Sequence, residues 1–115
     1  MKKLVSLFVV LLFASSFSYA QESKVVEAEF KISGNCGMCK SRLEKVMKIK
    51  EVKFAKWDKS TKLMKVAYLS PDITVDSLKH RAAEVGHDTD KFKADDAVYA
   101  KLPKCCLYRD NPTTH

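Results

Sequence analysis

The sequence lacks the motifs of the common hydrolytic and metal-dependent enzymes. It contains no H-E-x-x-H zinc-protease motif, no carboxylate pair spaced for acid–base catalysis, and no arrangement of a serine with a histidine. It has neither internal repeats nor low-complexity segments. Haem attachment is also excluded, because Lys40 and not a histidine follows the single C-x-x-C motif. These absences favour a binding protein over an enzyme.

No apolar run is long enough to cross a membrane as a helix. The run from residue 4 to residue 13 is shorter than the about 20 apolar residues that a bilayer requires. It follows a positively charged start and precedes Ser18-Tyr19-Ala20, which has the small-x-small form of a signal-peptidase site. We therefore interpret residues 1–20 as a cleaved signal peptide and not as an uncleaved helix. This interpretation predicts a periplasmic or secreted protein without stable membrane insertion.

Basic residues outnumber acidic ones. The formal net charge of +7 falls to +5 when the two lysines of residues 1–20, which contain no acid, are removed. The remaining lysines are scattered and form no basic tract, so they predict a solvated surface that attracts acidic proteins or anionic lipid head groups. An exported protein also meets little nucleic acid. We therefore expect no nucleic-acid partner.

The pattern after the signal predicts one small α+β domain, residues 21–94, followed by a C-terminal extension, residues 95–115. Thr74 and Gly86 are suitable start and stop signals for a helix between them. Periodicity predicts a strand at 25–32, a helix at 38–50, strands at 52–57 and 63–69, a helix at 75–85 and a strand at 87–94. This β-α-β-β-α-β order is that of the ferredoxin-like fold, a sandwich of two helices on a four-stranded antiparallel sheet.

Four cysteines occur in two close pairs, Cys36 with Cys39 and Cys105 with Cys106. Exported proteins commonly form disulfides, but neither pair closes a loop long enough to constrain the unfolded chain much. The first pair lies between the first strand and the first helix, where helix amides and the helix dipole stabilise thiolates. Two such thiolates suit soft ions such as Cu(I) and Zn(II). An exposed two-sulfur site also leaves room for the ligands of a partner, so that the ion can be exchanged.

With these residues the sequence resembles the heavy-metal-associated domain family, which includes copper chaperones, a periplasmic mercury-binding protein and the N-terminal domains of metal-pumping P-type ATPases. The resemblance covers residues 25–94 and rests on C-x-x-C after the first strand of a β-α-β-β-α-β chain. It implies binding and transfer of a heavy-metal ion, Cu(I) or Zn(II) first and Hg(II) or Cd(II) next, with a membrane metal transporter or an acceptor protein as partner. The family usually has Gly-Met-x-Cys-x-x-Cys, whereas Gly34 here occupies the place of the methionine.

Other residues can join or support this site. His87 follows the second helix, in a loop expected beside the C-x-x-C loop. Its possible roles are a third metal ligand, a hydrogen-bond donor to one of the ligands, or an exposed loop histidine without a role in the site. Cys105 and Cys106 can return to the end of the domain that holds C-x-x-C. The predicted last strand leads about 23 Å away from that end. A helix at residues 95–101 spans about 10 Å and the four residues to Cys105 span at most about 14 Å, which together just cover this distance. One possibility is that they complete a site of three or four thiolates, which favours tetrahedral zinc or cadmium. The alternatives are a vicinal disulfide, a separate metal site or an apolar plug. Met38 lies between the two cysteines of the first pair, and a thioether can bind Cu(I), but at this position we expect Met38 to pack or to point to solvent.

Two other functions use the same cysteines. A thiol–disulfide oxidoreductase also uses C-x-x-C in an oxidising compartment, but thioredoxin-like folds place the motif after an earlier β-α-β stretch, with a cis-proline opposite the cysteines. A structural module would keep both pairs as permanent disulfides. We prefer a soft-metal-binding protein, a metallochaperone or metal scavenger, over both.

Overall fold

The computed structural model of the protein describes residues 22–115. The predicted signal peptide, residues 1–20, lies outside this range. Within residues 22–115, no helix combines the length and the apolar character needed to cross a membrane.

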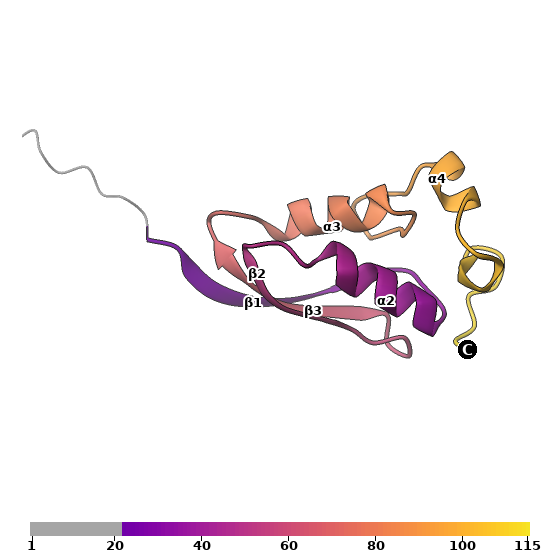
Figure 1. The fold of residues 1–115 in the computed structure, drawn as a ribbon, viewed down its shortest axis with the longest axis horizontal. Coiled ribbons are helices and arrows are strands. Elements are labelled where there is room, and N and C mark those ends of the chain that lie inside the picture. The colour runs from indigo at the N-terminus through magenta and orange to yellow at the C-terminus, as the bar shows by residue number, and fades with distance from the viewer. Residues whose placement is uncertain (1–21) are drawn as a thin grey trace, which may run out of the picture.

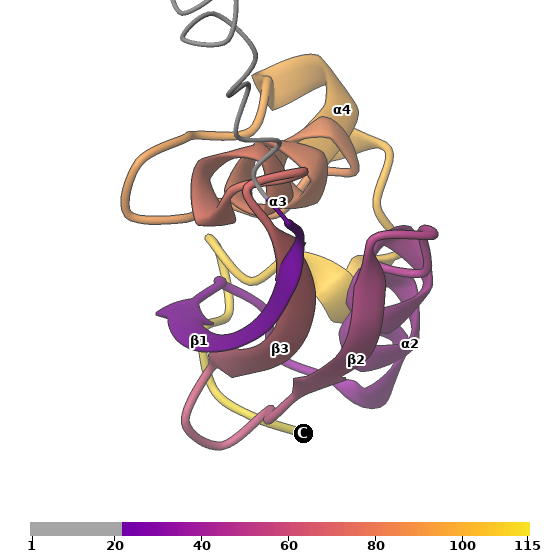
Figure 2. The same ribbon diagram turned by 90° about the vertical axis from the view of Figure 1, so that its left-hand side faces the viewer.

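A three-stranded antiparallel sheet forms one layer of the domain (Figure 1). Its strands are β1 (Lys24–Lys31), β2 (Val52–Trp57) and β3 (Leu63–Ser70), and β3 lies between the other two (Figure 2). Each strand lies within one residue of its predicted position. Because β1 alternates, Phe30 faces the core beside its β3 partner Met64, while polar neighbours on β1 face solvent.

Two helices, α2 (Gly37–Val46) and α3 (Val75–Glu84), cover one face of this sheet (Figure 1). Thr74 caps α3 as predicted, because its hydroxyl accepts the amide of Ser77 at 3.2 Å and the Ser77 hydroxyl accepts the amide of Thr74 in return. The first helix ends at Val46 and not near residue 50. There, Arg81 of α3 donates to the freed Val46 carbonyl at 2.9 Å.

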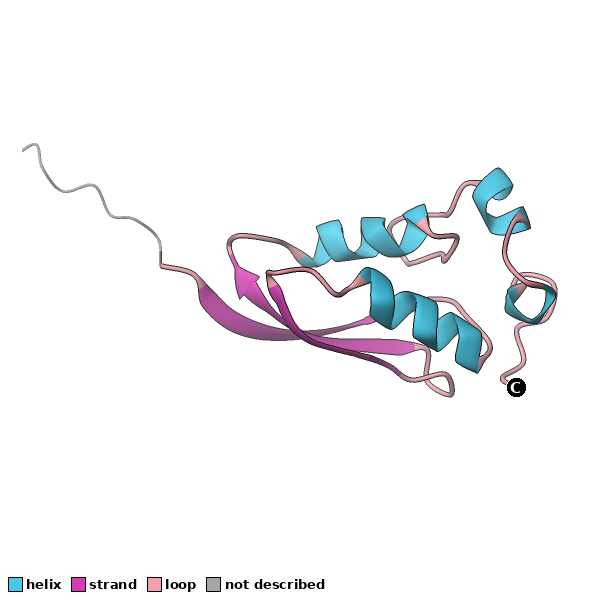
Figure 3. Cartoon of the chain, in the orientation of Figure 1, coloured by secondary structure: helices cyan, strands magenta, loops and turns pink. Residues whose placement is uncertain are grey.

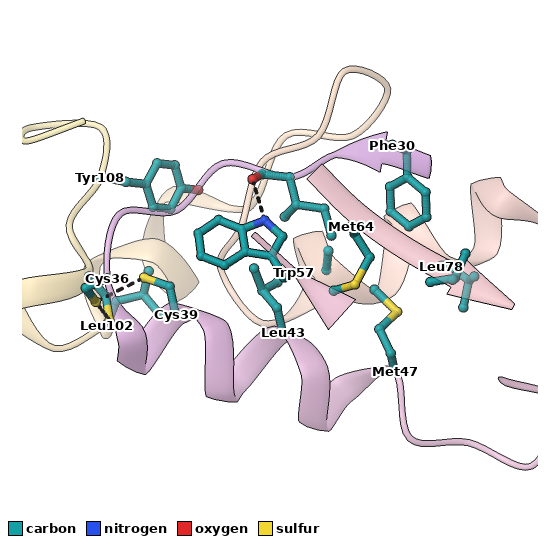
Figure 4. Packing of buried hydrophobic residues seen from close by; sticks show 14 of the residues in the cluster. Phe30, Cys36, Cys39, Leu43, Met47, Trp57, Met64, Leu78, Leu102 and Tyr108 are labelled. Carbon is teal, nitrogen blue, oxygen red and sulfur yellow. Dashed lines mark hydrogen bonds between the residues drawn. The ribbon is translucent and has the colours of Figure 1, made fainter. Parts of the chain in front are cut away.

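The hydrophobic core lies between the sheet and the helices (Figure 4). Its fully buried side chains come from every layer and include Leu43, Met47, Trp57, Met64 and Leu78. Burial of a side chain of this size contributes about 1.5–3 kcal/mol. Because these residues lie on β2, β3 and α3 and on or next to α2, their burial ties both helices to the sheet.

The predicted fourth strand, residues 87–94, is not formed, so the four-stranded sheet is corrected to three strands. This segment is a loop (Figure 3) that pairs with the sheet only through a bridge from Thr89 to the residue after β1. Thr89 Oγ1 accepts the amide of Phe92 at 3.0 Å, and Asp88 Oδ1 accepts the amide of Ala94 at 2.7 Å. Amides held by such local side chains are not available to a neighbouring strand.

The C-terminal extension folds back onto the domain. A short helix, α4 (Asp96–Ala100), and a 3-10 turn, η1 (Lys104–Cys106), bring it to the N-terminal end of α2 (Figure 1). Its apolar side chains join the core cluster, namely Tyr99, Leu102, Cys106 and Tyr108. The extension therefore shares one hydrophobic core with residues 22–94.

Candidate metal centre

Trp57 and Gly34 determine how the loop before the first cysteine packs. The Trp57 indole is fully buried, and its Nε1–H donates to the carbonyl of Ile32 at 3.1 Å (Figure 4). A Cβ atom on Gly34 would lie 2.9 Å from two carbons of this ring, which is closer than real Cβ contacts. The ring thus occupies the space in which a side chain at position 34 would begin. A tryptophan from β2 therefore packs this loop, in which the family's usual methionine is replaced by glycine.

Asn35 joins the same loop to the end of the chain. Its buried side chain donates through Nδ2 to the carbonyl of Asn111 at 2.8 Å, and its Oδ1 accepts the Cys39 thiol at 3.4 Å. Its own carbonyl accepts the amide of His115 at 2.9 Å. Asn35 is not among the predicted site residues, and its only sequence signal is its position directly before Cys36.

Three cysteine sulfurs meet at the start of α2. Cys36 Sγ lies 3.4 Å from Cys39 Sγ (Figure 4) and 3.3 Å from Cys106 Sγ, and all three sulfurs lie within 4.8 Å of one another. Cys39 and Cys106 are fully buried, and Cys36 is 4% exposed. The three residues and Cys105 are free cysteines. The structure thus brings together the C-x-x-C pair and one member of the second pair.

The surroundings of the thiols separate their pKa values. Burial raises the pKa of Cys36, but hydrogen bonds from the backbone amide of Cys39 and from the Cys106 thiol outweigh burial and lower this pKa to about 7. Burial raises the pKa of Cys39 to about 12. Of the two C-x-x-C thiols, Cys36 therefore loses its proton first, where the N-terminus of α2 favours a negative charge.

Arg42 and His87 stand behind the sulfur cluster. Arg42 Nη1 lies 3.5 Å from Cys106 Sγ and 3.3 Å from His87 Nε2. The other ring nitrogen of His87, Nδ1, donates to the Ser33 carbonyl at 2.8 Å. Burial, and to a smaller degree the charge of Arg42, lowers the pKa of His87 to about 4, so the ring is neutral at pH 7. His87 is thus a buried histidine whose two nitrogens contact groups other than sulfur.

Tyr108 and Arg109 hold the extension against the loop after α3. The Tyr108 ring stacks on His87 with the ring centroids 5.3 Å apart, and its hydroxyl donates to the Gly86 carbonyl at 2.7 Å. Arg109 donates to both carboxylate oxygens of Asp88, at 3.0 and 2.8 Å. Burial raises the pKa of Asp88, but the bidentate pair with Arg109 outweighs burial and holds this pKa below its ordinary value. These contacts place the extension so that it reaches the sulfur cluster.

Cys105 and Met38 lie at the outer edge of the cluster. Cys105 is half-buried, its Sγ lies 3.8 Å from Cys106 Sγ, and its thiol donates to Met38 Sδ at 3.3 Å. Met38 is 52% exposed, as expected for a residue that points to solvent, yet its sulfur contacts a thiol. Of the predicted ligands, Cys105 and His87 therefore lie outside the group of three sulfurs.

Three solved structures resemble this chain, whereas no protein-family profile and no curated protein matches it. The CopZ metallochaperone is 24% identical, with a TM-score of 0.53 over 56% of this chain and 98% of that protein. The N-terminal domain of a potential copper-translocating P-type ATPase from Bacillus subtilis, in its Cu(I)-loaded state, is 30% identical, with a TM-score of 0.53 over 56% of this chain and 84% of that domain. The water-soluble region of the P-type ATPase CopA from Bacillus subtilis is 21% identical, with a TM-score of 0.53 over 60% of this chain and 47% of that region.

These likenesses agree with the sequence pattern. A three-stranded antiparallel sheet under two helices matches the fold of these structures, and C-x-x-C follows β1 at the start of α2. The 30% identity over most of the ATPase domain extends the likeness from fold to sequence. The chain belongs to the heavy-metal-associated domain family.

Proposed function

We propose that the protein binds a soft heavy-metal ion through the thiolates of Cys36, Cys39 and Cys106. The observation that carries this proposal is the convergence of three sulfurs within 4.8 Å, from segments 70 residues apart in the chain. Sulfur ligands select soft ions. The proposed activity is binding and transfer of the ion, and not catalysis.

The spacing of the sulfurs suits an ion between them. Thiolates bound tetrahedrally to one zinc ion, each at about 2.3 Å, lie about 3.8 Å apart. Cys36 Sγ lies 3.3 and 3.4 Å from its two neighbours, so the side chains need to open by only about half an ångström. Arg42 beside Cys106 offsets part of the negative charge of the thiolates. Three protein ligands leave one tetrahedral position for a ligand from a partner.

Copper, as Cu(I), is the ion that we favour. Its support comes from the solved relatives, which are a metallochaperone and a domain of a potential copper-translocating ATPase. Zn(II), Cd(II) and Hg(II) share the preference for thiolates and are the alternatives. As partner we propose a membrane metal transporter or an acceptor protein. A periplasmic or secreted location rests on the signal peptide predicted from residues 1–20.

The extension distinguishes this site from an exposed two-sulfur shuttle. It supplies the third sulfur, from Cys106, and the three sulfurs are nearly or completely buried. A third ligand and exclusion of water both slow the loss of an ion. The proposed role is therefore tight holding with controlled delivery, as in a scavenger or a storage protein.

A thiol–disulfide oxidoreductase is the second candidate. The lowered pKa of Cys36, about 7, favours it, because a thiolate is the nucleophile in disulfide exchange. An oxidoreductase must also present that nucleophile to the disulfide of its substrate. Cys36 is only 4% exposed, which makes this candidate the weaker one.

Native mass spectrometry with a competing chelator tests the three-sulfur site. Wild type, Cys36→Ser, Cys106→Ser and Cys105→Ser would be titrated with Cu(I) and with Zn(II) under anaerobic conditions. We expect Cys36→Ser and Cys106→Ser to bind the first ion at least about tenfold more weakly than wild type does, a loss of about 1.4 kcal/mol or more in binding free energy. Cys105→Ser is the matched control and should keep that affinity.

Two results would contradict this proposal. Equal affinities of wild type and Cys106→Ser would exclude the third ligand. Reduction of insulin disulfides by the metal-free protein, at the rate of a true oxidoreductase, would favour the second candidate.

A further inference from the structure

Five sulfur atoms form a continuous row from the surface to the core. From the outside inward they belong to Met38, Cys105, Cys106, Cys36 and Cys39. Successive sulfurs are 3.3, 3.8, 3.3 and 3.4 Å apart. Exposure falls along the row, from 52% at Met38 through a half-buried Cys105 to three buried cysteines.

The proposed three-sulfur site leaves the outer two sulfurs unexplained. Met38 lies on the first turn of α2 and Cys105 on η1, so their contact joins residues 67 positions apart. A half-exposed methionine gains little from burial, and a thioether is a weak hydrogen-bond acceptor, so this contact adds little stability. A thioether beside a thiol is, however, a pair of soft donors of the kind that selects Cu(I).

The inner site also needs a route to solvent. Its three cysteine residues are at most 4% exposed, and η1 covers the end of α2 where they meet. An ion can reach them either by opening of the extension or by way of an outer ligand. The row of sulfurs supplies the second route without any unfolding.

We propose that Met38 and Cys105 form an outer, solvent-accessible site for a soft monovalent ion, Cu(I) or Ag(I), through which the ion reaches and leaves the buried three-sulfur site. This proposal rests on the proposed function, because Cys106 receives the ion from the outer pair. With metal–sulfur bonds of about 2.3 Å, one ion can touch both Cys105 and Cys106, whose sulfurs are 3.8 Å apart.

The transfer is a ligand exchange in which the ion keeps its oxidation state. The Cys105 thiol gives its proton to water as its bond to the ion forms. The bond from Cys106 to the ion forms next, as the Cys106 thiol gives its proton to water, and the thioether of Met38 is released. Cys36 and Cys39 then bond to the ion, and any thiol proton that they carry passes to water in the same way. When the bond to Cys105 breaks, that sulfur takes back a proton from water.

Methyl NMR of the full chain, labelled with ¹³C-methyl methionine and titrated with Ag(I), tests the outer site. We expect the Met38 methyl signal, identified by its loss in Met38→Leu, to shift within two equivalents of Ag(I). Met47 and Met64 are fully buried in the core and serve as internal controls whose signals should stay. An unmoved Met38 signal would overturn the proposal.

The rate at which Cu(I) passes to the chelator bathocuproine disulfonate tests the route. Met38→Leu and Cys105→Ser should slow this transfer about tenfold, which corresponds to a barrier about 1.4 kcal/mol higher. Lys104→Ala, a change of an exposed side chain on the same turn, is the matched control and should leave the rate unchanged. Rates equal to wild type in both sulfur variants would overturn the proposal and indicate opening of the extension as the route.

Counting ions by native mass spectrometry separates the two proposals. A wild type that binds one ion, without the methyl shift or without the rate effect, would refute only the outer site. A wild type that binds no ion would refute the proposed function itself.

Discussion

Replacing Gly34 by alanine should destabilise the protein, whereas the same change at Gly37 should not. A Cβ on Gly34 would lie 2.9 Å from two ring carbons of Trp57 and 3.2 Å from Cys39 Cβ. The ring cannot move away easily, because it is fully buried and bonded to the Ile32 carbonyl. A Cβ on Gly37 would meet no atom within 4 Å. Neither glycine has a positive φ, so backbone strain does not enter the comparison.

The magnitude follows from these contacts. Forcing an extra methyl group into a well-packed core costs about 1–3 kcal/mol. At the first residue of α2, alanine should instead be neutral or stabilising by about 0.5–1 kcal/mol, because glycine loses more backbone freedom on folding. The free energies of unfolding of the two variants should therefore differ by about 1–4 kcal/mol.

Urea unfolding of the metal-free, reduced protein measures this difference. Trp57 is the single tryptophan of the chain, so its fluorescence reports on the contact itself. We expect Gly34→Ala to unfold at a lower urea concentration and with altered native emission. Combining it with Trp57→Phe, followed by circular dichroism, should recover part of the loss, with a coupling of about 0.5–3 kcal/mol.

Two outcomes would refute this reasoning. An unfolding midpoint of Gly34→Ala equal to that of wild type would mean that the indole does not pack the loop. Equal losses in Gly34→Ala and Gly37→Ala would assign the cost to something other than the contact with Trp57.

Two further predictions concern the residues that anchor the extension. The free energy of unfolding of the metal-free protein should fall by up to about 3 kcal/mol as the pH drops from about 6.5 to 4. Burial holds the pKa of folded His87 at about 4, whereas the unfolded histidine takes up its proton near pH 6.5. Protonation in this range therefore favours the unfolded chain. Urea unfolding at several pH values checks this: His87→Gln should flatten the profile, and a flat wild-type profile or an equal effect of His80→Gln, at an exposed site, would contradict it. Arg109→Met should leave Asp88 without its bidentate partner and cost about 1.5–3 kcal/mol. Hydrogen exchange should then rise in residues 95–111 but not in α3, and an equal rise in both would show that the pair does not anchor the extension.

Most secondary structure could be predicted from local patterns. The strand predicted at residues 25–32 is observed as β1 (Lys24–Lys31), and Thr74 caps α3 as predicted. Strand faces and helix caps depend on residues only a few positions apart, so local patterns can indicate them. The place of C-x-x-C at the start of α2 is local in the same sense.

The fourth strand shows where such patterns fail. Residues 87–94 were compatible with an edge strand, but Asp88 and Thr89 bind the amides of their own segment. Asp88 also pairs with Arg109, which no local period could indicate. Side chains that can bond either nearby backbone or a distant partner make short polar segments hard to assign from sequence.

The candidate site divides in the same way. The residue types and their spacing were enough to name four cysteines and one histidine and to favour a soft ion. Only the folded structure shows that Cys106, and not Cys105, joins Cys36 and Cys39. The stack of Tyr108 on His87 fixes the orientation of the extension, and this orientation decides which of the two sulfurs faces the C-x-x-C pair. The same stack buries a histidine that could equally have been exposed. Cys36 and Cys106 are 70 residues apart in the chain, and their approach depends on packing across the whole domain, which no short-range period in the sequence encodes.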